Sequence, residues 1–310
     1  MNDTPLDIPA LRATLRNRED WLVGACGWTL PEPSAAVVDD ARAVVAKHRE
    51  SAPGLEASAG WNQGISPKLL PTLAAAYLHH ADESFADLAR AIIEKVLAAE
   101  PWHEGWLPRG KFDPLIIPHR LGDTECAGWF GVLPALLPSP AFDDGLVETM
   151  IRSARAQLNF LAGRLHEGRN IRLTQADALL TEGLRLRDLR EADRWTRLGV
   201  HVLNDGFHRQ IAADGASREA AAWYHFILMN MALRLWRLGN AAPELGLTIA
   251  AEKVAAMFDY TLACVEPDGR STRIGDTVGR ITPDGTLASF IARRGQVRRE
   301  LGMDSVELPD

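Results

Sequence analysis

The sequence LVETMIRSARAQLNFLAGRL, residues 146–165, decides the fold class. Its apolar residues recur every three or four positions, at Leu146, Met150, Ala154, Leu158, Leu161 and Leu165. This spacing places them along one face of an α-helix and leaves the charged residues on the other face. The stretch therefore predicts a long amphipathic helix that packs against other helices.

The same periodicity recurs on both sides of this helix. Upstream, Ser66-Pro67 is typical of a helix start. A helical hairpin follows, with apolar faces at Leu69, Leu70, Leu73 and Tyr77 and then at Phe85, Leu88, Ile92 and Val96. Downstream, further helices are predicted at 178–184, 195–211, 224–235 and 247–264.

Helices account for the whole pattern before residue 265, about nine of them. Short links between them favour antiparallel pairs, and no repeat of fixed length indicates a regular solenoid. We therefore predict an all-α fold, an incomplete (α/α) toroid of antiparallel helix hairpins. It occupies residues 1–264, of which 1–33 form a variable N-terminal segment.

The character of the chain changes at residue 265. Two turn sequences, Pro267-Asp268-Gly269 and Pro283-Asp284-Gly285, bracket a polar stretch, and 288–298 predicts one more helix. We interpret 265–310 as a linker and the truncated start of a C-terminal β domain.

Composition excludes several classes of function. The chain has 310 residues and a formal net charge of -7, with acidic and basic residues interspersed, which argues against a dedicated nucleic-acid surface. An acidic polymer could still bind in a locally basic cleft. Three distant cysteines, and no metal-binding, phosphate-loop or dinucleotide motif, lead us to expect no metal and no organic cofactor.

The N-terminal residues give an expectation about location. Met1 to Trp28 contain no apolar stretch typical of a signal peptide, and no run approaches the roughly 18 apolar residues of a membrane span. We expect a soluble, cytoplasmic chain without membrane contact, or a periplasmic or secreted one if the N-terminus is incomplete.

Three polar segments carry the candidate functional residues. The longest non-periodic stretch, residues 100–130, holds Trp106 and Arg120, and an Arg matches a carboxylate through two parallel hydrogen bonds. The second, HEGRNIR at 166–172, lies at a corner between two helices. The third, QIAADGASREAAAWYH at 210–225, ends where a long helix begins. Taken alone, Tyr224 on that helix is as typical of a packed core as of a cleft.

The second and third segments together resemble the heparinase II/III-like polysaccharide lyases. The run from Gln210 through Asp-Gly and Glu219 to Tyr224-His225 is similar to the family pattern. So are the corner at Asn170 followed by LLTEGL at 179–184, and PDGRSTRIGD at 267–276, which resembles the entry into the family's β-sandwich domain. The resemblance covers roughly residues 60–280.

The resemblance implies β-elimination on an acidic, uronic-acid-containing polysaccharide. It makes Tyr224, Asn170 and His225 the catalytic candidates, with Tyr224 as acid and in some members also as base. Candidates for binding the substrate are Arg120, Trp106, Glu219, Trp223 and His166. The sequence departs from the family at Ile171, where many members have His, and at Ala221, where the family has Ser. Because nearly all of the β-sandwich is also missing, the isolated chain could be inactive.

Two alternatives remain open. The first is a non-catalytic carbohydrate-binding or scaffold protein descended from the lyases, which Ile171 favours. The second is a glycoside hydrolase on the same scaffold, which needs two carboxylates across a cleft. Asp123 and Glu125 on one side and Asp177 or Asp214 on the other are the candidates.

Overall fold

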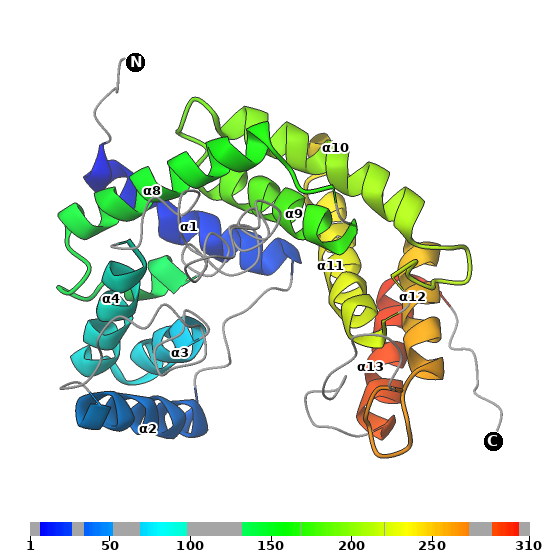
Figure 1. Ribbon diagram of the computed structural model, residues 1–310, viewed down its shortest axis with the longest axis horizontal. Helices are drawn as coiled ribbons and strands as arrows, with labels where there is room; N and C mark the ends of the chain where they lie inside the picture. The colour runs from blue at the N-terminus through cyan, green and yellow to red at the C-terminus, as the bar shows by residue number, and fades with distance from the viewer. Residues whose placement is uncertain are drawn as a thin grey trace, which may run out of the picture. The chain divides into compact units, whose positions relative to one another are not determined.

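A computed structural model describes most of the chain as helices (Figure 1). The described residues are 7–26, 34–51, 69–97, 132–167, 169–219, 221–272 and 287–303. They contain no strand, only two isolated β-bridges. The helices are α1 (Ile8–Cys26), α2 (Ala35–Ser51), α3 (Leu70–His80), α4 (Glu83–Leu97), α8 (Asp144–Gly163), α9 (Arg169–Arg185), α10 (Ala192–Gln210), α11 (Ala222–Ala241), α12 (Ala251–Ala263) and α13 (Leu287–Glu300), with a 3-10 turn η4 (Pro243–Leu245).

These helices form two compact units. Unit 1 comprises Met1–Gly24, Trp28–Glu167 and Thr174–Gly199; unit 2 comprises Ala25–Gly27, Gly168–Leu173 and Val200–Asp310. The predicted boundary at 264/265 concerns the start of a C-terminal β domain and stays a prediction. Within the described part of 265–310, the chain is helical at α13 and forms a β-bridge between Val265 and Ser271.

Unit 1 has the core that the periodicity predicts. Most of the residues expected to face inward from the hairpin and from the long helix are buried: Leu70, Leu73, Tyr77, Phe85, Leu88, Ile92, Leu146, Met150, Ala154, Leu158 and Leu161. Leu69 and Leu165 are half-buried and pack against this core. The hairpin turns at Ala81, whose φ of 49° lets its N–H reach the Tyr77 carbonyl at 2.7 Å and end α3. Ser66-Pro67 and the Val96 side chain lie outside the described residues.

No helix was predicted for the N-terminal segment, residues 1–33. Residues 8–26 form α1, and its buried residues Ile8, Leu11, Leu15 and Leu22 pack into the unit 1 core or beside it. Their spacing is helical, so the signal was present. The frequent charged residues between them obscured it.

A buried charge cluster joins α1 to α9 in unit 1. Arg185 is fully buried and binds Glu19 with Nε at 2.5 Å from Oε2 and Nη2 at 3.2 Å from Oε1. Its Nη1 donates to Glu182, which is also fully buried. Because Glu19 already neutralises Arg185, Glu182 is the surplus carboxyl group. Burial raises its pKa to about 8.

Unit 2 centres on α11, α12 and α13. Leu228, Met231 and Leu235 are buried as predicted, whereas Ile227 is 38% exposed, because the apolar face of α11 is narrower than its sequence indicates. Phe258 of α12 stacks on Phe290 of α13, with ring centroids 6.1 Å apart. The helix predicted at 288–298 is thus confirmed and forms part of this core.

No helix among the described residues combines the length and the apolarity that crossing a membrane requires.

Candidate active site

A short hairpin precedes α11 and supports its start. Ile211 and Ser217 form an antiparallel bridge, and the Ala212 N–H donates to the Ala216 carbonyl at 2.9 Å. At the tip, Asp214 Oδ1 accepts the Ala216 N–H at 3.0 Å, and Gly215 has a φ of 87°. The Asp-Gly pair of the sequence motif is therefore a turn, formed by an Asp that bonds its own backbone and a residue in left-handed conformation.

This hairpin is fixed on α12 through the main chain. A Cβ atom at Gly215 would lie 2.1 Å from the Ala256 carbonyl oxygen, so only glycine allows the approach. Lys253 Nζ donates to the carbonyls of Phe207 and Ile211 at 3.2 and 3.1 Å. Burial lowers the pKa of Lys253. The sequence did not identify Lys253, because its partners are backbone atoms of a distant segment.

Glu219 connects the segment before α11 to the start of α9. Its Oε1 accepts the backbone N–H of Asn170 at 2.9 Å. That N–H is one of the first-turn donors that a helix leaves without an internal partner, and a carboxylate there also meets the positive end of the helix dipole. Both residues belong to unit 2. Glu219 is thus a helix cap supplied from 49 residues away in sequence.

The Asn170 side chain is oriented by its own helix. Its Oδ1 accepts the Ile171 N–H at 2.6 Å. This bond restricts the rotation of the amide group at the start of α9. Ile171 takes part in this turn through its backbone, and its side chain is half-buried.

Tyr224 lies in the first turn of α11 and is half-buried. Its neighbour Trp223 stacks on Phe226, with centroids 6.2 Å apart. Ala221, the residue that departs from the family pattern, occupies the N-cap position with an extended backbone and makes no side-chain cap. The helix that carries Tyr224 therefore lacks the cap that a Ser there could provide.

His225 has a different environment from Tyr224. It is 2% exposed, its Nε2 lies 3.0 Å from the Met257 carbonyl oxygen, and its ring meets the Tyr260 ring edge-on at 4.9 Å. Burial lowers its pKa, and its Nδ1 has no hydrogen-bond partner among the described residues. In the structure His225 anchors α11 to α12, and its predicted direct role stays a prediction.

The remaining predicted residues belong to unit 1 or lie outside the described residues. His166 belongs to unit 1, where its backbone N–H donates to Gln175 Oε1 at 2.8 Å. Trp106 and Arg120 lie outside the described residues, and so do Asp123 and Glu125 of the hydrolase alternative. Of the opposing carboxylates, Asp214 forms the hairpin turn and Asp177 belongs to unit 1.

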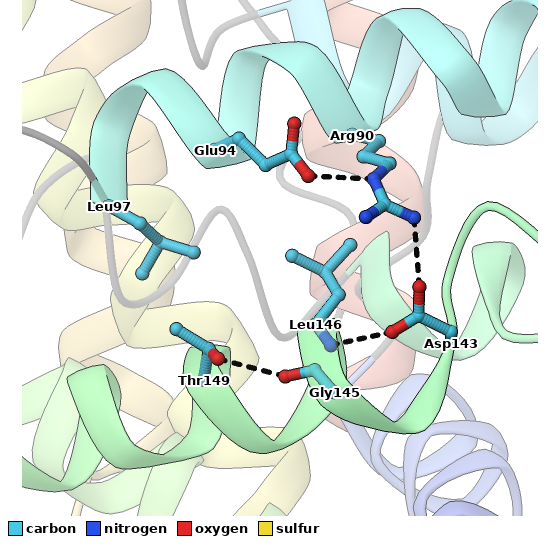
Figure 2. A pocket seen from close by; sticks show the side chains of 7 residues that line it. All are labelled: Arg90, Glu94, Leu97, Asp143, Gly145, Leu146 and Thr149. Atoms are coloured by element: carbon cyan, nitrogen blue, oxygen red, sulfur yellow. Dashed lines mark hydrogen bonds and ion pairs between the residues drawn. The ribbon is translucent and has the colours of Figure 1, made fainter.

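A surface hollow in unit 1 offers no competing site. Figure 2 shows its lining, in which Arg90 binds Glu94 at 2.7 Å and Asp143 at 2.9 Å. Asp143 also caps α8 by accepting the Leu146 N–H at 2.9 Å. The charges satisfy one another, so the hollow is a structural corner between α4 and α8. Across the described part of the chain, no three His, Cys, Asp or Glu side chains are grouped to hold a metal ion.

Comparisons with known proteins show the family of the chain. The family model described as "Heparinase II/III N-terminus" matches residues 73–282. A heparin-sulfate lyase of Pedobacter heparinus is 25% identical over 145 residues, which are 45% of this chain and 21% of that protein.

Solved structures show the same fold. A crystal structure of heparinase III superposes with a TM-score of 0.66 and 17% identity over 88% of this chain and 45% of that one. The heparan sulfate lyase HepC from Pedobacter heparinus gives a TM-score of 0.59 at 17% identity, over 94% and 49%. The chain thus spans about half the length of these structures. The predicted fold class, an all-α incomplete toroid, is confirmed by this likeness.

Proposed function

Because the chain belongs to the heparinase II/III N-terminus family, we propose that it is the helical part of a polysaccharide lyase. The reaction is β-elimination on a glycan that contains uronic acid. The observation that carries the proposal is the hydrogen bond from the Asn170 backbone to Glu219. It fixes the start of α9 to the segment that leads into Tyr224. Asn170 and Tyr224, two of the three catalytic candidates, therefore lie on segments that this bond joins.

Tyr224 is proposed as the residue that moves protons. The C5 proton of a uronate is weakly acidic because the adjacent carboxylate is already negative, and the leaving glycosidic oxygen needs a proton. A phenol can donate that proton and, once ionised, can accept another. Tyr224 is half-buried in the first turn of its helix, whereas its neighbour His225 is enclosed.

Asn170 is proposed to act on the uronate carboxylate. The family resemblance supports this role, and the bond from the Ile171 N–H to Oδ1 fixes the orientation of the amide at the start of α9. Donors placed against a carboxylate stabilise the enolate-like charge that develops when C5 loses its proton. Glu219 and His225 are positioning residues: the first holds α9 and the second holds α11.

The substrate class follows from the relatives. The curated match is named a heparin-sulfate lyase, and the solved neighbours are heparinase III and a heparan sulfate lyase. We therefore propose a heparan-sulfate-like acidic glycan as the first substrate to test.

The test compares tyrosine variants with heparan sulfate as substrate. Elimination creates a carbon–carbon double bond, so unsaturated product is followed by its ultraviolet absorbance. Tyr224→Phe should abolish product formation while leaving glycan binding nearly unchanged. Tyr77→Phe is the matched control: Tyr77 belongs to unit 1, its hydroxyl donates to Glu83 Oε1 at 3.0 Å, and its loss should leave elimination intact.

Three results would contradict the proposal. Full activity of Tyr224→Phe removes Tyr224 from the mechanism. Cleaved glycan without a double bond indicates the hydrolase alternative. Binding without any cleavage indicates the non-catalytic alternative, which the inert Ile171 side chain favours, since it can neither give nor take a proton.

A further inference from the structure

The three helices of unit 2 are basic within an acidic chain. α11, α12 and α13 carry seven Arg and Lys residues against three Asp and Glu residues, whereas the whole chain has a net charge of -7. Local positive charge of this kind raises the concentration of anionic ligands nearby. A cation on these helices can attract such a ligand only if no carboxylate of the protein already neutralises it.

Three of the arginines are paired with carboxylates. Arg237 binds Glu300 through two hydrogen bonds of 2.6 Å. Arg294 and Arg298 share Asp259, at 2.5 and 2.9 Å. These pairs use two of the three carboxylates on the three helices.

Arg293 is held by neutral groups. Its Nη2 donates to Asn230 Oδ1, and its guanidinium lies over the Phe258 ring, 5.6 Å from the centroid. Asn230 in turn donates from Nδ2 to the Phe226 carbonyl at 2.8 Å, which fixes the amide in the orientation that accepts from Arg293. No described carboxylate pairs with Arg293.

Burial and a like charge both act on Arg293. Burial lowers its pKa, and the nearby Arg237 guanidinium lowers it further. A half-buried cation beside another cation is unfavourable unless an anion compensates it. The side chain nevertheless keeps part of its surface open to solvent. Its planar guanidinium presents further N–H donors, which suit the oxygens of a sulfate or carboxylate.

We propose that Arg293 forms a binding position for one oxyanion of an acidic glycan, with Asn230 orienting its guanidinium. The choice of a glycan as the source of the oxyanion rests on the proposed function. The site itself does not require chemistry at Tyr224. Its ligand is either a sulfate ester or a uronate carboxylate.

The experiment measures binding of a heparan sulfate octasaccharide to the whole chain by calorimetry. Arg293→Gln should weaken binding about tenfold, the effect of losing one charge-assisted contact. Arg293→Lys keeps the charge but lacks the planar guanidinium, so its affinity for the octasaccharide should lie between those of wild type and Arg293→Gln. Arg299→Gln is the control, because Arg299 is an exposed arginine on the same helix and its loss changes net charge equally.

Modified octasaccharides identify the oxyanion. If the group is a sulfate, desulfated octasaccharide should bind wild type and Arg293→Gln equally. If the group is a carboxylate, the carboxyl-reduced octasaccharide should bind wild type and Arg293→Gln equally. Equal loss of affinity in Arg293→Gln and Arg299→Gln would show diffuse charge rather than a site and would overturn the proposal. So would unchanged affinity of Arg293→Gln for the unmodified octasaccharide.

A second readout separates this site from the proposed reaction and from misfolding. Sodium sulfate should raise the Tm of wild type more than that of Arg293→Gln, relative to sodium chloride of equal ionic strength, because a ligand stabilises the state that binds it. Tyr224→Phe should retain the full sulfate effect and the full octasaccharide affinity. Failure of elimination with retained Arg293-dependent binding would count against the lyase proposal alone.

Discussion

At the scale of single residues, Gly215 shows why the Asp-Gly pair of the motif is needed. Its left-handed conformation makes the turn, and its missing side chain lets the hairpin meet the α12 backbone at Ala256. The sequence indicated the turn, because Asp-Gly is typical of one. The contact with α12 could not be predicted, since it joins segments about forty residues apart without a side-chain signal.

Gly215→Ala should therefore destabilise the protein by more than the usual cost of placing alanine in a left-handed backbone conformation. We expect the free energy of unfolding to fall by at least about 3 kcal/mol, since strain in φ adds to a collision with backbone. Gly246→Ala is the control: Gly246 has a φ of 73°, but an added Cβ meets nothing within 4 Å. It should lose only about 1 kcal/mol. Urea denaturation checks both, and equal losses would contradict the argument.

Adjacent residues of the motif proved to have different environments. Tyr224 and His225 are neighbours in sequence, yet one is half-buried and the other is enclosed beside Met257 and Tyr260. Helical geometry turns successive side chains by about 100°, so a motif cannot tell which neighbour faces the core. Family resemblance assigned a chemical role to both.

At the scale of elements, the capping of α9 links stability to the site. Glu219→Ala should lower the free energy of unfolding by about 1 kcal/mol, the usual value of a helix cap, and should also slow elimination by displacing Asn170. Asp143→Ala is the control, because Asp143 caps α8 in unit 1. It should lose similar stability and keep its activity per folded molecule. Denaturation and product formation are measured on the same preparations.

Glu219→Gln refines this test. The amide keeps an acceptor for the Asn170 N–H but loses the charge that favours the helix N-terminus. Stability and activity between those of wild type and Glu219→Ala are expected. Activity of Glu219→Ala equal to that of wild type would show that the cap does not position Asn170.

Element identity was largely readable from the sequence. The helices from α3 to α13 have apolar residues at helical spacing, and burial of that face selects the helix over alternatives. The capping of α9 by Glu219 could not be predicted from the sequence. Without knowledge of its partner, Glu219 cannot be distinguished from a solvent-exposed acidic residue. The N-terminal helix α1 was missed for a similar reason, since its apolar face is diluted by charged residues such as Arg12 and Arg18 that pair with distant backbone or side chains.

At the scale of the whole molecule, the two units should respond to pH in opposite directions. The folded-state pKa of Glu182 is raised to about 8, so its contribution to stability is complete below its ordinary value near 4.5 and is lost as the pH rises through 8. The pKa of His225 is lowered from 6.5, so its contribution is complete above 6.5 and is lost as the pH falls through the folded value.

Acidification from pH 7 to pH 5.5 should therefore favour the surroundings of Glu182 in unit 1 and weaken those of His225 in unit 2. Hydrogen exchange, corrected for intrinsic rates, should show protection rising over 174–199 and falling over 250–263. Glu182→Gln should flatten the first trend and His225→Gln the second. Parallel trends that neither variant alters would contradict the two assignments.

The main-chain bond between Asn170 and Glu219 has a consequence for how such a protein can change. Position 171 contributes its N–H to the same turn, and neither of the two hydrogen bonds uses its side chain. A histidine or an isoleucine can therefore occupy it while Asn170 keeps its place. Ile171→His should therefore leave the bond between Asn170 and Glu219, and with it the start of α9, intact.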